Sequence, residues 1–190
     1  MPPPAKCAAL VTAERLLASA YGIIPRDLFQ EPEAEEYCGW KFTVNDLACR
    51  FRQGKVTPTK NGQFVTLYDR SPTTNKIVPV GTVDVTPSLF MVQCVEKDHI
   101  GHFMFPSTAL QTNKIAASNG TGGKLAFRVY PPWVDVESKQ AAAAQKWQCQ
   151  YFIFDKDACN HKSTILSYLN GTTTTPANRI SGEKRPRSEG

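Results

Sequence analysis

The chain has 190 residues, a formal net charge of +5 and a hydrophobic content of 41%. This length is enough to bury a globular core, and the composition excludes a disordered or fibrous protein. No run of roughly eighteen apolar residues occurs, so the sequence predicts neither a membrane span nor a membrane partner. We expect one domain over residues 1–170, followed by a disordered Thr-rich and basic tail over residues 171–190.

The beginning of the chain predicts helical structure. Apolar residues at helical spacing indicate a helix over residues 7–21, and Gly22 follows where a C-terminal cap would lie. The acidic stretch over residues 26–38 is also expected to be helical.

The middle of the chain changes to the alternation that is typical of strands. Residues 41–44 and 47–52 predict a hairpin with Asn45 and Asp46 at its turn. Pro58 lies in a segment that we expect to be a loop, residues 54–62, and a further strand follows. The remaining elements expected before the Gly-rich loop are a strand over 63–68, a connector over 71–82, and strands over 89–95 and 102–105.

The second half ends in a strand and a helix. A Gly-rich loop over residues 112–123 precedes a strand over 125–130, which two prolines stop. A helix is expected from about residue 136 to about residue 154, capped by Asp135 or Ser138. These elements predict an α+β fold with a mixed central sheet flanked by helices.

The cysteines bear on the cellular compartment. Six cysteines occur without a C-x-x-C spacing, and Glu14 and Arg15 interrupt the apolar N-terminal stretch, which excludes a signal peptide. We therefore expect reduced, mostly buried thiols in a cytoplasmic, possibly nuclear, protein. The six residues are Cys7, Cys38, Cys49, Cys94, Cys149 and Cys159.

Charge is distributed unevenly along the chain. Residues 26–36 contain one base and five acids, whereas residues 41–60 contain five bases and one acid. A basic stretch beside an acidic one is consistent with a polyanion-binding surface and its boundary, and equally with two ordinary solvated faces.

One stretch, residues 51–65, is unusually rich in groups that bind anions. It combines bases, threonine hydroxyls and glycines around a single proline. Lys and Arg attract phosphate, hydroxyls donate hydrogen bonds, and glycine lets backbone N–H groups approach closely. The stretch is therefore either an anion-contacting loop or a tight crossover between strands whose lysines point at water.

Two later stretches have similar character. Arg128 alternates with apolar neighbours on its strand, so it faces away from them and can reach a carboxylate or a phosphate. Tyr130 and Trp133 form either a platform for stacked bases or an aromatic lock at the strand end. Gln140 and Gln148 are either hydrogen-bond donors to sugar and phosphate or part of a polar helix surface.

Catalytic templates are sparse. His99 and His102 lack the further ligands of a zinc site, and no phosphate-binding loop, dinucleotide fingerprint or nucleophile elbow occurs. Residues 137–139 resemble half of a nuclease motif only weakly, and Asp84 and Glu96 pair only if the fold brings them together. We therefore assign no catalytic residue, no metal and no cofactor from the sequence.

Several of these stretches resemble the MepB-type family in order and spacing, over about residues 10 to 155. The matching motifs are KVTPTKNGQFVTL (55–67), GHFMFP (101–106) and RVYPPW (128–133), with Lys139, Gln140, Gln145, Trp147 and Gln148. The resemblance implies a core like that of PD-(D/E)XK nucleases and nucleic-acid binding without clear sequence preference, but no proven cleavage. The chain departs from the family pattern at Gly54, where alanine is usual, and at Ser107, where lysine often occurs.

We therefore expect a non-catalytic, sequence-tolerant nucleic-acid binder whose weak affinity falls with salt. No oligomeric state is assigned. A metal-dependent nuclease is one alternative, and a small-molecule or protein-interaction module linked to drug response, with an apolar pocket between Tyr130, Trp133 and Trp147, is another. The residues expected to contact nucleic acid are Arg50, Arg52, Lys55, Thr57, Thr59, Lys60, Gln63, Arg128, Gln140 and Gln148.

Overall fold

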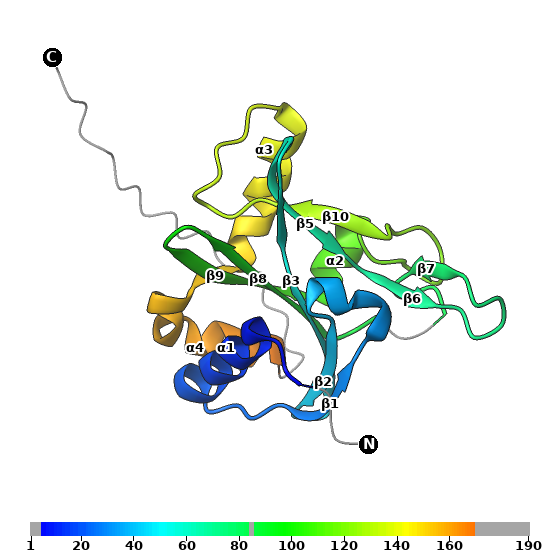
Figure 1. The fold of residues 1–190 in the computed structure, drawn as a ribbon, viewed down its shortest axis with the longest axis horizontal. Coiled ribbons are helices and arrows are strands. Elements are labelled where there is room, and N and C mark those ends of the chain that lie inside the picture. Colours follow the sequence, from blue (N-terminus) through cyan, green and yellow to red (C-terminus); the bar gives the residue numbers. More distant parts are fainter. Residues whose placement is uncertain (1–4, 84–85, 170–190) are drawn as a thin grey trace, which may run out of the picture.

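A mixed six-stranded sheet forms the centre of the molecule in a computed structural model that describes residues 5–83 and 86–169 (Figure 1). Its strand order is β1-β2-β3-β8-β9-β11, in which β3 and β8 run parallel and all other neighbours run antiparallel. The expected α+β class with a mixed central sheet is confirmed. The strands are β1 (Arg26–Gln30), β2 (Trp40–Val44), β3 (Leu47–Gln53), β8 (Leu89–Glu96), β9 (His99–Pro106) and β11 (Phe152–Phe154).

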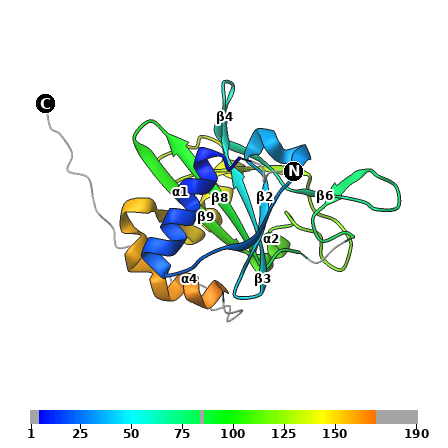
Figure 2. The same cartoon turned by 60° about the horizontal axis from the view of Figure 1, so that its bottom comes forward.

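Two smaller sheets lie in the chain between β3 and α3. A three-stranded sheet has the order β10-β5-β4, and the antiparallel pair of β6 and β7 forms a separate ribbon. The β4 end of the β4–β5 hairpin projects from the body of the molecule (Figure 2). The bounds are β4 (Lys55–Thr57), β5 (Lys60–Thr66), β6 (Tyr68–Arg70), β7 (Ile77–Pro79) and β10 (Ala126–Val129).

Helices cover both faces of the central sheet. The first helix, α1, continues as a π-helix to Tyr21 and ends at Gly22, whose φ of 71° is the left-handed cap that the sequence predicts. The α-helices are α1 (Ala8–Leu16), α2 (Ser107–Thr112), α3 (Lys139–Gln148) and α4 (Lys162–Leu169). Short helices span Leu17–Tyr21, Pro32–Tyr37, Cys149–Tyr151 and Asp155–His161. No helix in the described part of the chain combines the length and apolar character that crossing a bilayer requires.

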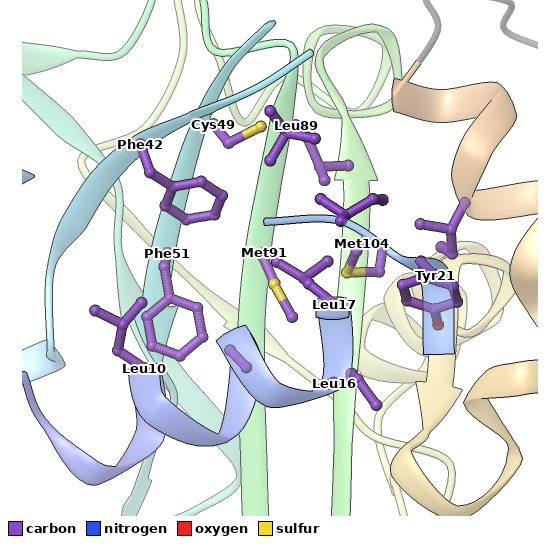
Figure 3. Close-up of a cluster of buried hydrophobic side chains, with 14 of the residues drawn as sticks. Leu10, Leu16, Leu17, Tyr21, Phe42, Cys49, Phe51, Leu89, Met91 and Met104 are labelled. Carbon is purple, nitrogen blue, oxygen red and sulfur yellow. The ribbon is translucent and has the colours of Figure 1, made fainter. Parts of the chain in front are cut away.

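The hydrophobic core has two parts, one on each face of the sheet. On one face, Phe51 and Met91 of the sheet form a cluster with Leu10 of α1 (Figure 3). On the other face, Phe90 and Phe105 pack against the β5–β10 layer and α2. Since successive side chains of a strand point to opposite faces, both faces of β3 are covered by protein.

Several segments differ from the sequence prediction, which also did not include β7, α2 and α4. Residues 26–38 are helical only in part: Arg26–Gln30 pairs with β2 as β1, and Pro32 holds Glu31 in an extended conformation before a short 3-10 helix over Pro32–Tyr37. Residues 54–62 are not a loop but most of the β4–β5 hairpin. The helix expected over residues 136–154 is α3, which ends at Gln148 because Phe152–Phe154 pairs with β9 at the sheet edge. Its start is as expected, since Ser138 Oγ accepts a hydrogen bond from the Ala141 N–H.

The cysteines also differ in part from expectation. Cys7 and Cys38 form a disulfide that joins the start of α1 to the end of the Pro32–Tyr37 turn, so these two are not reduced thiols. Burial raises the pKa of Cys49 to about 12 and that of Cys149 to about 11. Both therefore stay protonated and unreactive at neutral pH. The tail over residues 171–190 and Asp84 lie outside the described residues.

Candidate functional site

Arg50 and Arg52 lie inside the protein. Arg52 has an exposed fraction of 0%, and its Nη1 donates to Glu31 Oε2 at 2.5 Å and to the Phe51 carbonyl at 2.9 Å. Arg50 pairs with Asp69 and lies 3.8 Å from Glu31. Both arginines are expected from the sequence to contact nucleic acid, but the β6 strand and residues 31–37 cover this face of β3 and enclose their guanidinium groups. Neither is free to reach a phosphate in this conformation.

The acidic stretch neutralises much of the basic stretch. We call residues 31–37 the acidic segment. Besides Glu31, it contributes Glu33, which accepts from Arg70 Nε at 2.9 Å, and Glu36, which pairs with Lys55. The charge asymmetry seen in the sequence is thus mainly a boundary of ion pairs between neighbouring elements, buried at Glu31 and exposed at Glu33 and Glu36.

Glu33 should titrate at lower pH than an ordinary glutamate. The hydrogen bond from Arg70 lowers the pKa of the Glu33 carboxyl. Because the lowered pKa belongs to the folded state, this pair stabilises the fold above the unfolded-state pKa and ceases to do so as pH falls through the folded-state pKa. We expect carbon-detected NMR titration to show this, and Arg70→Ala to return Glu33 to its ordinary range. An unchanged Glu33 titration in that variant would contradict the assignment.

Arg128 braces the tip of the β4–β5 hairpin. Its Nη1 donates to the carbonyls of Lys60, Asn61 and Gly62 at 3.3–3.5 Å, and its Nη2 donates to Thr57 Oγ1 at 2.8 Å. Since β10 pairs with β5, this guanidinium holds a turn that lies far from it in the sequence. The hairpin is therefore a preformed projection.

Gly62 is required where the tip returns toward β10. Its φ of 77° is in the left-handed region, and a Cβ there would lie 2.6 Å from the Tyr130 ring. Asn61 Nδ2 donates to the Asp135 carbonyl at 2.9 Å. The hairpin tip is thereby held beside the segment that leads into α3.

Gln63 and Gln148 are buried structural residues. Gln148 accepts from the Tyr130 N–H at 2.8 Å and donates to the Arg128 carbonyl at 2.9 Å, which joins α3 to β10. Gln63 donates to the Val95 carbonyl at 3.2 Å. Both amides are enclosed, with exposed fractions of 0% for Gln63 and 1% for Gln148. Both were expected to contact nucleic acid, but in this structure each amide points inward and ties neighbouring elements together.

The other expected residues lie at the surface and converge in part. Thr59 and Lys60 are exposed at the hairpin turn. Lys55 lies across the hairpin, with its Nζ 4.6 Å from the centre of the Tyr37 ring. Gln140 is exposed on the first turn of α3. The hairpin thus brings together Lys55, Thr57, Thr59, Lys60 and Arg128, while Gln140 lies on a separate element.

The two tryptophans of the apolar pocket that the sequence suggested, Trp133 and Trp147, pack against core aromatic rings. Trp133 packs edge-on against Phe152 at 5.3 Å between ring centres, and Trp147 packs against Phe105 at the same separation. This favours a structural role for both tryptophans.

Acids and histidines do not converge into a metal site in the described structure. Within residues 5–83 and 86–169, no three His, Cys, Asp or Glu side chains form a group that could hold a metal ion. Glu96 accepts from Trp133 Nε1 at 2.9 Å, and His102 Nδ1 lies 2.7 Å from Asp155 Oδ1. These side chains have structural partners instead.

This surface also includes residues that the sequence does not single out. Tyr37 packs against Phe64 with ring centres 6.1 Å apart, and the Asn61 tether was not expected. Nothing local indicates that Asp69 is the partner of Arg50, because that pairing depends on the fold.

Comparisons with known proteins support the resemblance seen in the sequence. A family model described as MepB-like matches residues 31–154. A solved structure titled "Crystal Structure of MepB" is similar with a TM-score of 0.65 and 28% sequence identity, covering 78% of this chain and 97% of that chain. No curated protein matches the chain.

Proposed function

The chain belongs to the MepB-like family, and on that premise we propose that it binds nucleic acid without sequence preference and without catalysis. The observation that carries the proposal is the projecting β4–β5 hairpin with Lys60 and Thr59 at its turn, braced by Arg128. The nuclease-like core that the resemblance implies remains a prediction.

The charge of this hairpin supports the proposal. Within the described residues, no carboxylate pairs with Lys60 or Arg128. Among residues 5–83 and 86–169, the carboxylate that pairs with Lys55 is Glu36, whose side chain is 73% exposed, and such surface pairs are weak and screened by salt. A polyanion can therefore replace Glu36 at Lys55 at little cost.

The shape and chemistry of the hairpin favour backbone contacts over base recognition. A two-stranded ribbon fits the major groove of a duplex. Lysine charge and threonine hydroxyls address phosphate oxygens, which fix position but carry no sequence information. Because the brace holds the turn before any ligand arrives, binding loses little conformational freedom in the protein.

The double variant Lys55→Ala/Lys60→Ala tests the proposal. We expect weaker binding of DNA and RNA alike, and a dependence of log affinity on log salt that is shallower by about two, because about one counterion is released per phosphate contact. Fluorescence anisotropy with labelled single and double strands at several salt concentrations measures both quantities. Labelled strands incubated with Mg²⁺ should stay intact.

Two further variants sharpen this test. Lys76→Ala/Lys162→Ala removes the same charge from exposed positions outside the hairpin and should change affinity less. Glu36→Gln releases Lys55 and should strengthen binding. Equal losses in the two double variants would show that net charge, and not the hairpin, attracts the ligand.

A further inference from the structure

A cavity of about 500 Å³ lies between the acidic segment, β1, β2, β3 and β6. Its size is within the range of small-molecule sites. The acidic segment separates it from the hairpin: Glu33 faces Arg70 at the cavity, whereas Glu36 and Tyr37 face Lys55 on the hairpin. No residue that we proposed to contact nucleic acid at the hairpin lines this cavity.

Within residues 5–83 and 86–169, two residues of the inner wall each have a buried side-chain atom without a hydrogen-bond partner. Arg52 and Asp69 both line it, with exposed fractions of 0% and 6%. Among the described residues, neither the Nε–H of Arg52 nor Oδ2 of Asp69 has a hydrogen-bond partner. Buried polar groups are nearly always paired, and leaving one unpaired is costly. One donor and one acceptor on the same wall are complementary to a ligand edge that carries one acceptor and one donor.

The remaining walls supply aromatic surface and positive charge. Phe29 lines the cavity with 59% of its surface exposed, and Tyr68 lines it from β6. Lys41 and Arg70 also line it, with side chains 42% and 40% exposed. Lys41 lies 3.7 Å from Glu31, so most of its donor capacity is free for an anion. Glu33 also lines the cavity and pairs with Arg70 at 2.9 Å, so Lys41 is the cation with the larger free donor capacity. The site thus combines a polar inner wall, flat rings and partly paired cations toward solvent.

We propose that this cavity binds one nucleotide, with its base inside against Phe29 and Tyr68 and its phosphate at Lys41 and Arg70. Every base presents a flat π-face that can stack on Phe29 and Tyr68. Base edges also carry acceptor and donor groups, which are the partners that Arg52 Nε–H and Asp69 Oδ2 lack. The base comes from an unstacked position in a single strand or from a free nucleotide. The single-strand source rests on the proposed function and deepens it. A strand bound at the hairpin would pass over the acidic segment to place one base in the cavity.

Phe29→Ala tests the site, with Phe29→Tyr as the variant that keeps the ring and Ile24→Ala as an exposed apolar control outside the cavity. Anisotropy is measured with a single strand, with a duplex of the same sequence and with an abasic strand of equal length. Adenosine monophosphate is titrated separately by calorimetry. We expect Phe29→Ala to weaken single-strand binding about tenfold, as loss of one stacked base implies. Duplex and abasic-strand binding should change less than about twofold, and Phe29→Tyr should restore the single strand.

The outcomes separate the two sources and the two proposals. Adenosine monophosphate binding that depends on Phe29 identifies a free nucleotide as the ligand and supports the site even if no strand binds, in which case the proposed function fails alone. Strand binding that depends on Lys60 but not on Phe29, with no Phe29-dependent binding of adenosine monophosphate, overturns the nucleotide site and leaves the proposed function standing.

Discussion

Replacing Glu31 by alanine is expected to destabilise the fold by about 3–5 kcal/mol, because it removes one partner of a buried ion pair. Glu31 has an exposed fraction of 7% and contacts Arg52 directly, while Arg50 lies within ion-pair distance. Without it, the Arg52 guanidinium keeps only the Phe51 carbonyl as a partner among the described residues. Urea unfolding followed by circular dichroism measures the loss.

The control for this prediction is Glu35→Ala. Glu35 belongs to the same acidic segment but is exposed, so its removal should change stability by less than about 0.5 kcal/mol. Replacing both members of the buried pair with apolar residues of similar volume should cost much less than Glu31→Ala alone, since no unpaired charge remains inside. A single variant as stable as the control would show that Arg52 reaches solvent.

Phe103→Ala is expected to cost about 3–5 kcal/mol, the usual loss for emptying a large site in a rigid core. Phe103 is fully buried, lies 5.1 Å from Phe105 in a stacked arrangement and meets Phe152 edge-on at 4.7 Å between ring centres. It therefore links β9, β11 and the second part of the core. Thermal and urea unfolding should both report the loss.

The matched comparison is Phe29→Ala, which removes the same ring from a surface position. Its effect on unfolding should stay within about 0.5 kcal/mol, so this variant can report on ligand binding without a loss of structure. If the two variants lost similar stability, the assignment of Phe103 to the core and of Phe29 to the surface would be contradicted.

Alternation predicted the β2–β3 hairpin correctly, including its turn, but not the environment of its polar face. Cys49 and Phe51 point to one side and Arg50 and Arg52 to the other, as period-two geometry requires. The sequence predicts that both arginines contact nucleic acid. They are buried because Asp69 and Glu31 arrive from other elements, and local sequence does not encode such partners.

Short elements at the sheet edges were predicted least well. Arg26–Gln30 and Phe152–Phe154 become strands because β2 and β9 offer unpaired edges to them. Both segments are too short to show a strand pattern of their own, so tertiary pairing decides their conformation. For the same reason, the helix predicted over residues 136–154 extends beyond Gln148, where α3 ends.

The candidate surface was predicted in part. The bases and threonines around Pro58 were selected from composition, and Thr59 and Lys60 do lie exposed on one turn. That Arg128 would brace this turn, and that Gln148 would hold Arg128 from behind, depends on the pairing of β10 with β5. The cavity beside the acidic segment draws on five elements and had no sequence signal.

The brace from Arg128 has a consequence for the order in which the molecule is assembled. The β2–β3 and β8–β9 hairpins form from neighbouring residues, whereas the β10–β5 pairing must first close a long loop, which makes it late and slow. During synthesis, the projecting turn emerges long before the arginine that fixes it. A nascent chain therefore displays Lys55 and Lys60 on a turn that Arg128 does not yet hold. The turn becomes rigid only after β10 has paired with β5.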